Sequence, residues 1–209
     1  MSEENTLNRR NVLKQLGGAA AGSLAIASSG VASAEKPDLE ERYAGRASLR
    51  EAFRDHAADL PAALADAGVV SEEFDFEQVD FAVDPDATKV RPTDADGRAG
   101  VTVVAASGPR SALGMISTST DDHDISLYVQ PQREESYAFV EPKDDGDRFV
   151  VTDDGDEVTT LECTYKSCSC ERCYNPDGVM YYYEEEYRCN TDCTDCFVEG
   201  TECICTSCS

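Results

Sequence analysis

All ten cysteines of this 209-residue chain lie within its last 47 residues. A segment of that length buries too little apolar surface to fold on its own, so it needs covalent or metal cross-links. The even number of cysteines predicts a disulfide framework, in which each bridge contributes about 2–4 kcal/mol. The candidate disulfide cysteines are Cys163, Cys168, Cys170, Cys173, Cys189, Cys193, Cys196, Cys203, Cys205 and Cys208.

Metal binding is the alternative use of these thiols. The pairs Cys170-x2-Cys173 and Cys193-x2-Cys196 are separated by 19 residues, a spacing typical of zinc ribbons. The triplet Cys189-x3-Cys193-x2-Cys196 matches the spacing of an iron–sulfur site. A zinc ribbon would leave six cysteines unexplained, and the segment contains no histidine. Disulfides are therefore the favoured interpretation, a structural zinc site is the alternative, and we expect no other cofactor.

The cysteine-rich segment, residues 163–209, also contains a hairpin signal. The triplet C-x-C-x2-C occurs near both of its ends, at residues 168–173 and 203–208, as a quasi-repeat. Between the triplets, the Asn-Pro-Asp-Gly sequence within residues 174–178 predicts a turn, and the tyrosine-rich run 179–188 after it predicts a strand. Alternation along this strand places Tyr181, Tyr183 and Tyr187 on one face and Tyr182, Glu184 and Glu186 on the other.

Acidity is the second strong feature of the chain. It has 42 Asp and Glu residues against 18 Lys and Arg residues, and its formal net charge is -24. Such a surface repels phosphate backbones and anionic lipid head groups, so we expect no nucleic-acid and no membrane-surface partner. In concentrated salt the Debye length falls to about 3 Å and the self-repulsion is screened. The composition therefore predicts a protein of a halophile; the alternative, a disordered acidic chain, is disfavoured by the core periodicity of two stretches described below.

The first 34 residues resemble a twin-arginine export signal. Arg9 and Arg10 are followed by Asn-Val-Leu-Lys, then by a weakly apolar run rich in Gly and Ala, and then by Ala-Ser-Ala ending at Ala34. The apolar run is shorter than the ~20 residues that a membrane span needs. We therefore expect export by the twin-arginine translocase, cleavage after Ala34, and a secreted or cell-surface protein without stable membrane insertion. The residues do not identify its extracellular partner.

Residues 35–76 predict a helical segment. Apolar side chains recur at helical spacing between Ala47 and Ala67, which indicates an amphipathic helix. Pro61 breaks or kinks this helix, and Gly68 ends it. The apolar stripe comprises Leu49, Phe53, Ala57, Leu60 and Leu64.

Residues 77–162 predict an antiparallel β domain. Short runs rich in β-branched and aromatic residues alternate with turn signals such as Asp-Gly and Gly-Pro. The connections are short, which favours antiparallel neighbours in a β-meander of six or seven strands. The expected fold class is α+β, with the amphipathic helix packed on the meander and a small cysteine-rich hairpin module after it. The predicted strands span residues 78–83, 100–106, 112–117, 124–129, 136–140, 147–151 and 157–161.

Signals of catalysis are weak. The chain contains no Gly-rich nucleotide loop, P-loop, Gly-x-Ser-x-Gly or His-Glu-x-x-His motif. The Asp-Asp-His-Asp cluster at residues 121–124 offers ligands for a cation or, with His123 and Ser119, a base and a nucleophile. An acidic turn is, however, expected from the composition alone. His56 lies beside the helix stripe with no cysteine or second histidine near it. We therefore expect no catalytic residues, and a hydrolase that uses either histidine is the least favoured alternative.

A twin-arginine signal, an acidic middle domain without catalytic motifs and a C-terminal segment with ten cysteines together resemble the layout of microhalocin precursors of haloarchaea. The resemblance implies an N-terminal portion that acts as an immunity protein and a cysteine-rich C-terminus that is released as an antimicrobial peptide. We expect an exported, non-enzymatic protein whose disulfide-stapled module is a halocin-like precursor or binds an extracellular partner. The alternative is an exported metal-binding protein with a zinc-ribbon-like or iron–sulfur thiolate site.

Overall fold

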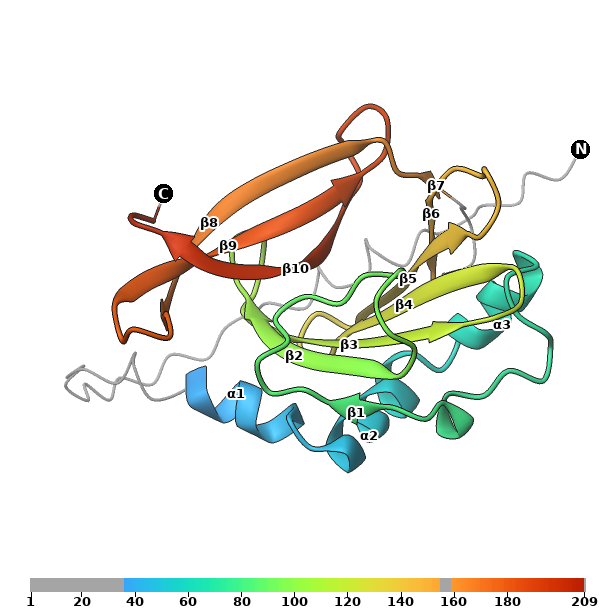
Figure 1. The fold of residues 1–209 in the computed structure, drawn as a ribbon, viewed down its shortest axis with the longest axis horizontal. Coiled ribbons are helices and arrows are strands. Elements are labelled where there is room, and N and C mark those ends of the chain that lie inside the picture. The colour runs from blue at the N-terminus through green and yellow to red at the C-terminus, as the bar shows by residue number, and fades with distance from the viewer. Residues whose placement is uncertain (1–35, 155–158, 209) are drawn as a thin grey trace, which may run out of the picture. The chain divides into compact units, whose positions relative to one another are not determined.

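The computed structural model describes residues 36–154 and 159–208, which form a mostly β protein with a few helices (Figure 1). The predicted export signal lies outside the described residues. The helices are α1 (Lys36–Tyr43), α2 (Arg46–His56), α3 (Leu60–Asp66) and a short 3-10 helix at Phe76–Gln78. Sheet A contains β1 (Ala82–Val83), β2 (Arg98–Val104), β3 (Ser111–Ser119), β4 (His123–Gln130), β5 (Glu135–Pro142), β6 (Phe149–Thr152) and β7 (Thr159–Thr160). Sheet B contains β8 (Cys163–Tyr174), β9 (Met180–Cys189) and β10 (Cys196–Cys205).

The sequence predicts one amphipathic helix that Pro61 breaks or kinks, and the structure has two separate helices there, α2 and α3. α2 ends at His56, and α3 begins at Leu60 with Pro61 in its first turn, where a proline removes no intrahelical hydrogen bond. Gly68 follows α3 with a φ of 73°, a left-handed conformation that glycine adopts without strain. None of the described helices is long and apolar enough to cross a membrane. The buried residues of α2 and α3 are Leu49, Ala52, Phe53, Leu60, Ala63 and Leu64.

Sheet A is a meander with one departure from the predicted topology. Its strands follow one another in sequence order, and every pair from β2 to β7 is antiparallel. β1 pairs with β2 in parallel, so the prediction of antiparallel neighbours throughout is wrong at this edge. A parallel pair needs a long connection, and residues 84–97 supply it. β1 is also shorter than the predicted strand 78–83: Gln78 belongs to the 3-10 helix, where Asp75 accepts a hydrogen bond from the backbone N–H of Glu77, and residues 79–81 belong to no strand.

Both faces of sheet A are covered. Side chains alternate between the two faces along each strand, so in β4 Leu127 belongs to the core on the helix side and Tyr128 to the core on the other side. The second core joins the two sheets. It contains Val90, Val104, Leu113, Met115, Tyr128, Tyr137, Phe139 and Val150, together with Tyr187, Cys189 and Val198 of sheet B. The cysteine-rich strands therefore share a core with the rest of the described chain.

Sheet B has three strands in the order β10-β9-β8, so the prediction of a two-stranded hairpin is incomplete. Both of its strand pairs are antiparallel. β10 was missed because Gly200 and neighbouring charged residues interrupt the apolar alternation typical of a strand. The outer edge of β10 is covered by the segment before β2. Thr201 donates its backbone N–H to the Thr88 carbonyl at 2.8 Å, and Lys89 forms a bridge with Gly200.

Candidate functional site

The ten cysteines form five disulfides, which confirms the predicted framework. Three bridges join the two C-x-C-x2-C triplets to each other, and the other two lie at the opposite end of sheet B. The quasi-repeat of the triplets was the sequence signal that could have indicated this pairing. Multiple disulfides are typical of an oxidising, extracellular setting. The pairs are Cys163–Cys193, Cys168–Cys205, Cys170–Cys208, Cys173–Cys203 and Cys189–Cys196.

At one end of sheet B, two of the bridges between the triplets join the two outer strands, β8 and β10, to each other across the central strand β9. Cys168–Cys205 and Cys173–Cys203 join the outer strands β8 and β10, with Cα–Cα distances of 6.0 and 5.8 Å. In a flat sheet, two strands separated by a third lie about 9.6 Å apart. Register shifts between Cys168 and Arg172 in β8, and between Cys203 and Cys205 in β10, let the strands bend toward each other. This end of sheet B is therefore rolled and covalently closed.

The described cysteines do not assemble either of the alternative metal sites. The predicted zinc ligands belong to four different disulfides, and the iron–sulfur triplet is divided between two of these. Cys168 and Cys205 place their sulfurs within 4.8 Å of a carboxylate oxygen of Glu184, but the two sulfurs are bonded to each other. The thiolate is the form that binds metals, and a disulfide provides none. The predicted zinc ligands were Cys170, Cys173, Cys193 and Cys196.

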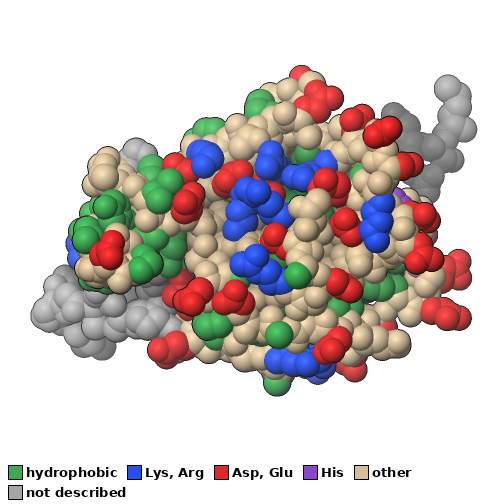
Figure 2. All heavy atoms as spheres, viewed as in Figure 1, with side chains coloured by type: hydrophobic (Ala, Val, Ile, Leu, Met, Phe, Trp, Pro, Cys, Tyr) green, Lys and Arg blue, Asp and Glu red, His purple; other side chains and the backbone are tan. Residues whose placement is uncertain are grey.

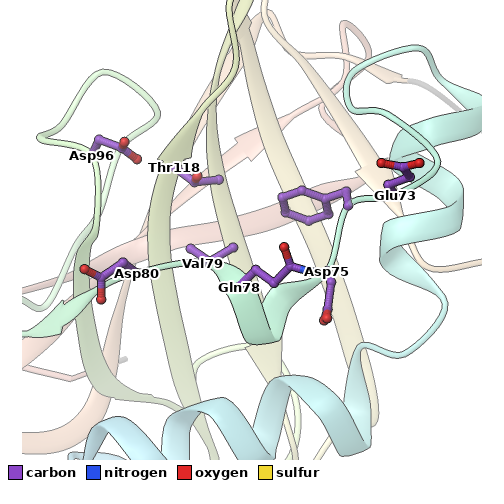
Figure 3. Close-up of a pocket in the computed structure, with 8 residues that line it drawn as sticks. Glu73, Asp75, Gln78, Val79, Asp80, Asp96 and Thr118 are labelled. Carbon is purple, nitrogen blue, oxygen red and sulfur yellow. The ribbon is translucent and has the colours of Figure 1, made fainter.

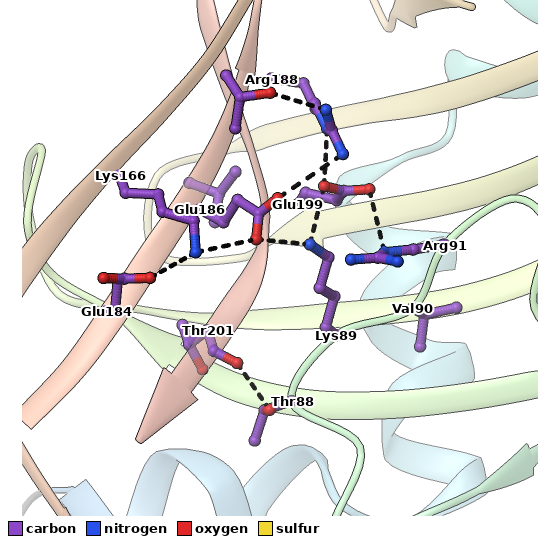
Figure 4. A network of polar contacts seen from close by, with 12 residues as sticks. Thr88, Lys89, Val90, Arg91, Lys166, Glu184, Glu186, Arg188, Glu199 and Thr201 are labelled. Carbon is purple, nitrogen blue, oxygen red and sulfur yellow. Dashed lines mark hydrogen bonds and ion pairs between the residues drawn. The ribbon is translucent and has the colours of Figure 1, made fainter. Parts of the chain in front are cut away.

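A buried cluster of opposite charges joins sheet B to the rest of the chain (Figure 4). Glu199 of β10 is fully buried, and its carboxylate lies 2.9 Å from Arg188 Nε and 3.0 Å from Lys89 Nζ. Arg91 and Arg148 approach its other oxygen at 3.9 and 3.8 Å. A buried carboxylate requires such partners because burial removes its water. The cluster therefore ties β9 and β10 to the segment before β2 and to Arg148, the residue directly before β6.

Glu186 extends this cluster toward solvent. Its carboxylate lies 2.8 Å from Lys89 Nζ, and 3.7 Å from both Lys166 Nζ and a guanidinium nitrogen of Arg188. Partial burial alone raises the pKa of Glu186, but the hydrogen bond and charge of Lys89 and the charges of the other two cations outweigh it. The pKa of Glu186 is therefore lowered. Sequence reasoning placed Glu186 on a face of its strand but missed these partners, because most of them come from distant segments.

Glu185 is a second fully buried carboxylate. Its Oε1 accepts hydrogen bonds from the backbone N–H groups of Ala105 and Ala106 at 2.6 and 2.8 Å, and its Oε2 accepts one from the Tyr187 hydroxyl at 2.6 Å. Burial and the hydrogen bond to Glu185 raise the pKa of Tyr187, so its hydroxyl stays protonated at neutral pH. The loop after β2 is thereby fixed to the centre of sheet B. Alternation could have found Glu185, since it shares a face with Tyr183 and Tyr187, which are both buried.

The exposed large hydrophobic side chains of the described residues all belong to the cysteine-rich segment. One of them is Tyr165, and the other four gather at the disulfide-closed end, where Figure 2 shows clustered hydrophobic side chains on the left. Tyr174 pairs with Met180 across the hairpin, and the Cys173–Cys203 bridge holds β10 beside them. We call these four side chains the apolar tip. They are Tyr174, Val179, Met180 and Ile204.

The turn that carries the apolar tip is held by its own hydrogen bonds. Asn175 donates its backbone N–H to the Val179 carbonyl at 3.0 Å. Its side-chain oxygen accepts the N–H groups of Asp177 and Val179 at 3.1 and 2.8 Å. Gly178 closes the turn with a φ of 77°, which glycine adopts without strain. The turn expected at residues 174–178 thus lies between β8 and β9.

The described contacts do not bring either histidine into a catalytic arrangement: His123 is not joined to Ser119, its suggested nucleophile, and His56 lies apart from both. His123 begins β4, and its ring packs edge-on against Phe149 with the centroids 6.4 Å apart. Ser119 lies opposite Asp124 in the β3–β4 pair, and no described hydrogen bond joins Ser119 to His123. His56 ends α2 beside a shallow hollow of about 210 Å³ that is lined largely by carboxylates.

A second hollow, of about 300 Å³, lies around the 3-10 helix (Figure 3). Its carboxylates are spread along the rim, with Asp80 and Asp96 on one side and Glu73 on the other. Asp80 lies 2.5 Å from Arg46, and Asp75 accepts a backbone hydrogen bond. These carboxylates do not converge on one point, so the hollow has no arrangement specific for a ligand.

In comparisons with known proteins, no family model, no curated protein and no solved structure matches this chain. The feature that remains informative about function is the apolar tip on its disulfide-closed support.

Proposed function

We propose that the protein is an exported, non-enzymatic binding protein of a high-salt environment, and that it contacts its partner through the apolar tip. The observation that carries this proposal is that the exposed large hydrophobic side chains of the described residues are confined to the cysteine-rich segment. Clustered apolar side chains on a soluble protein mark interaction sites, and tyrosine and methionine are enriched in such interfaces. The predicted export signal and the five disulfides support a place outside the cell.

A high-salt environment favours an apolar contact surface. The chain carries a net charge of -24, and molar salt reduces the range of charge interactions to about 3 Å. Long-range electrostatic attraction therefore contributes little to partner binding under these conditions. Apolar burial is not screened in this way, and excluded salts such as sulfate strengthen it.

A halocin-like precursor is the second candidate. All five disulfides join cysteines within residues 163–208, so one cut before Cys163 would release a covalently intact peptide. Release would also expose the buried side chains of Tyr187, Val198 and Glu199, which the rest of the chain covers. The shared core therefore favours a role for the intact chain over a role for the released segment.

Intact mass of the native protein from culture medium tests the proposal. The measurement is made with and without alkylation of free thiols, and metal content is determined on the same sample. We expect a chain that starts after Ala34, retains residues 35–162 and carries five disulfides. A short peptide that begins near Cys163 would favour the antimicrobial alternative. Ten alkylated thiols, or one equivalent of zinc or iron, would contradict the disulfide framework.

A further inference from the structure

We propose that four cysteines at the end of sheet B opposite the apolar tip form a thiol–disulfide exchange site with two alternative pairings. In the structure Cys163 is bonded to Cys193, and Cys189 is bonded to Cys196. The second pairing joins Cys163 to Cys189 and Cys193 to Cys196. An external thiol converts one pairing into the other without being consumed. This activity is separate from the binding function proposed for the apolar tip.

Three of the four cysteines form a row across sheet B. Cys189 is the only cysteine of the central strand β9, and it lies directly opposite Cys163 of β8 on one side and Cys196 of β10 on the other. Residues directly opposite each other in antiparallel strands share a face, and their Cα atoms lie about 4.5–5.5 Å apart. A disulfide needs Cα atoms about 4.4–6.8 Å apart. Cys189 therefore has a suitable partner on either side.

Cys193 completes the site from the turn between β9 and β10, which lies next to the start of β8 (Figure 1). With Cys196 it forms a Cys-x-x-Cys sequence, the spacing found in disulfide oxidoreductases. The remaining way to pair all four cysteines would join Cys163 to Cys196. These two lie on the outer strands, which are about 9.6 Å apart in a regular sheet, too far for a bridge. The site therefore has two feasible pairings.

The sulfurs of the turn are accessible to an external thiol. Cys193 and Cys196 are exposed, whereas Cys163 is half-buried and Cys189 is fully buried. Cys193 is also flanked by exposed residues on both sides. Thiol–disulfide exchange depends on access to the attacked sulfur, so the first attack is placed at Cys193.

The exchange takes three displacements and needs no oxidant or reductant. The external thiolate attacks Sγ of Cys193 and forms a mixed disulfide with it, and the thiolate of Cys163 leaves. Cys163 then attacks Sγ of Cys189, and the thiolate of Cys196 leaves. Cys196 attacks Sγ of Cys193, and the external thiolate is released. The number of disulfides is unchanged, but the turn is no longer bonded to β8.

Hydrogen bonds within the turn keep Cys193 close to Cys196 for the last step. Cys193 donates its backbone N–H to the Asn190 carbonyl at 2.9 Å. The side-chain oxygen of Asn190 accepts the N–H groups of Thr194 and Asp195 at 2.9 and 3.3 Å. These bonds do not involve β8, so the turn keeps its shape when its bridge to β8 opens. The final displacement is therefore between preorganised groups.

Disulfide mapping of the full, oxidised protein tests the proposal. The protein is incubated in molar sodium chloride with millimolar 2-mercaptoethanol, and free thiols are then alkylated. Cleavage after Lys166 and Arg188 and before Asp192 and Asp195 separates the four cysteines for mass spectrometry. We expect the second pairing in at least about 1% of the molecules, as for a minor state a few kcal/mol above the major one. Its rate of formation is proportional to the thiol concentration, and the three bridges between the triplets are retained.

A pair of double variants tests the geometry without reference to the rate. Cys193→Ser with Cys196→Ser leaves Cys163 and Cys189, which we expect to form a bridge. The matched control, Cys189→Ser with Cys193→Ser, leaves Cys163 and Cys196 on the outer strands, and both are alkylated. Circular dichroism verifies that each variant is folded.

Three outcomes would each overturn the proposal. They are the absence of a Cys163–Cys189 bridge after prolonged incubation with thiol, two alkylated thiols in the folded Cys193→Ser, Cys196→Ser variant, and linkage of the four cysteines at random with those of the triplets. None of these outcomes involves the apolar tip, so failure of the exchange site is distinguishable from failure of the binding function.

Discussion

Residues 36–154 and the cysteine-rich residues 163–208 hold their structure by different means. The first region contains no cysteine and packs α1, α2 and α3 against one face of sheet A. The second region carries five disulfides and contributes few apolar side chains to a core, among them Tyr187 and Val198. Those side chains pack on the other face of sheet A. A small cross-linked sheet can therefore complete the core of a larger neighbour instead of building one of its own.

The junction between the two regions is also polar. Glu199 and Glu185 are fully buried in sheet B, but Lys89, Ala105 and Ala106 outside sheet B supply contacts to them. Separation of the sheets would leave these carboxylates without those contacts, which is costly for buried charges. The predictions below are ordered by their expected effect on this junction.

Reduction of the disulfides is expected to have the largest effect. Each bridge is worth about 2–4 kcal/mol, so their joint loss unfolds sheet B and uncovers one face of sheet A. Thermal unfolding in molar salt, followed by circular dichroism with and without reductant, measures the change. As a graded control, removal of the Cys189–Cys196 bridge, with a sequence separation of 7, has a smaller effect than removal of Cys170–Cys208, with a separation of 38. Equal midpoints for the oxidised and reduced chains would contradict this role of the bridges.

Glu199→Gln is expected to have the next largest effect. It removes the negative charge that Lys89 and Arg188 share, and breaking one side of a buried ion pair costs about 3–5 kcal/mol. Chemical denaturation of the oxidised protein gives the free energy of unfolding. Glu202→Gln, an exposed position on the same strand, is the control and changes stability by less than about 0.5 kcal/mol. If the two variants are equally stable, Glu199 does not join the two regions as described.

Gly200→Ala is expected to disturb the junction to a smaller extent. A Cβ at this position would lie 2.6 Å from the Cβ of Lys89, and overpacking of this kind costs about 1–3 kcal/mol. Gly45→Ala is the control, because its Cβ would meet only the Ser48 hydroxyl, at 3.2 Å. Chemical denaturation again measures both variants, and a Gly200→Ala protein as stable as its parent would show that the 88–90 segment does not lie against β10.

The pH dependence of Glu186 is expected to be the smallest effect. Its pKa is lower in the folded chain, so its carboxylate contributes stability above its unfolded pKa of about 4.3, and this stability is lost as the pH falls further. Glu186→Gln therefore flattens the decline in unfolding free energy below about pH 4, by no more than about 1 kcal/mol. Glu202→Gln should leave the decline unchanged. Unfolding curves at several acidic pH values measure it, and an unaltered slope for Glu186→Gln would contradict the predicted linkage.

Local patterns in the sequence predicted most strands of sheet A and the turn before β9. The predicted strands 112–117 and 124–129, for example, lie within β3 and β4, because alternation and turn residues act over a few neighbouring positions. The parallel pairing of β1 escaped prediction because it depends on the path of residues 84–97. β10 escaped because Gly200 is required there by the close approach of Lys89, which no local pattern reveals.

The candidate site was predictable in chemistry but not in arrangement. The even number of cysteines and the expected export of the chain predicted disulfides. Which cysteines pair depends on the order of the three strands of sheet B, which the sequence did not indicate. In the sequence, nothing distinguishes Glu185 and Glu199 from the other acidic residues of a chain that has 42 Asp and Glu residues. Their burial follows from distant contacts with the loop after β2 and with Lys89. The apolar tip could not be predicted either, because the sequence does not show which of its apolar side chains are exposed in the folded chain.

Association of the two regions after a cut between them tests the shared core most directly. A peptidase recognition site is inserted between Asp154 and Thr159, the oxidised protein is cut there, and the products are passed through a gel-filtration column in molar salt without denaturant. The common core and the Glu199 cluster predict that the two fragments elute together at the volume of the uncut protein. Elution of two separate, folded fragments would contradict it.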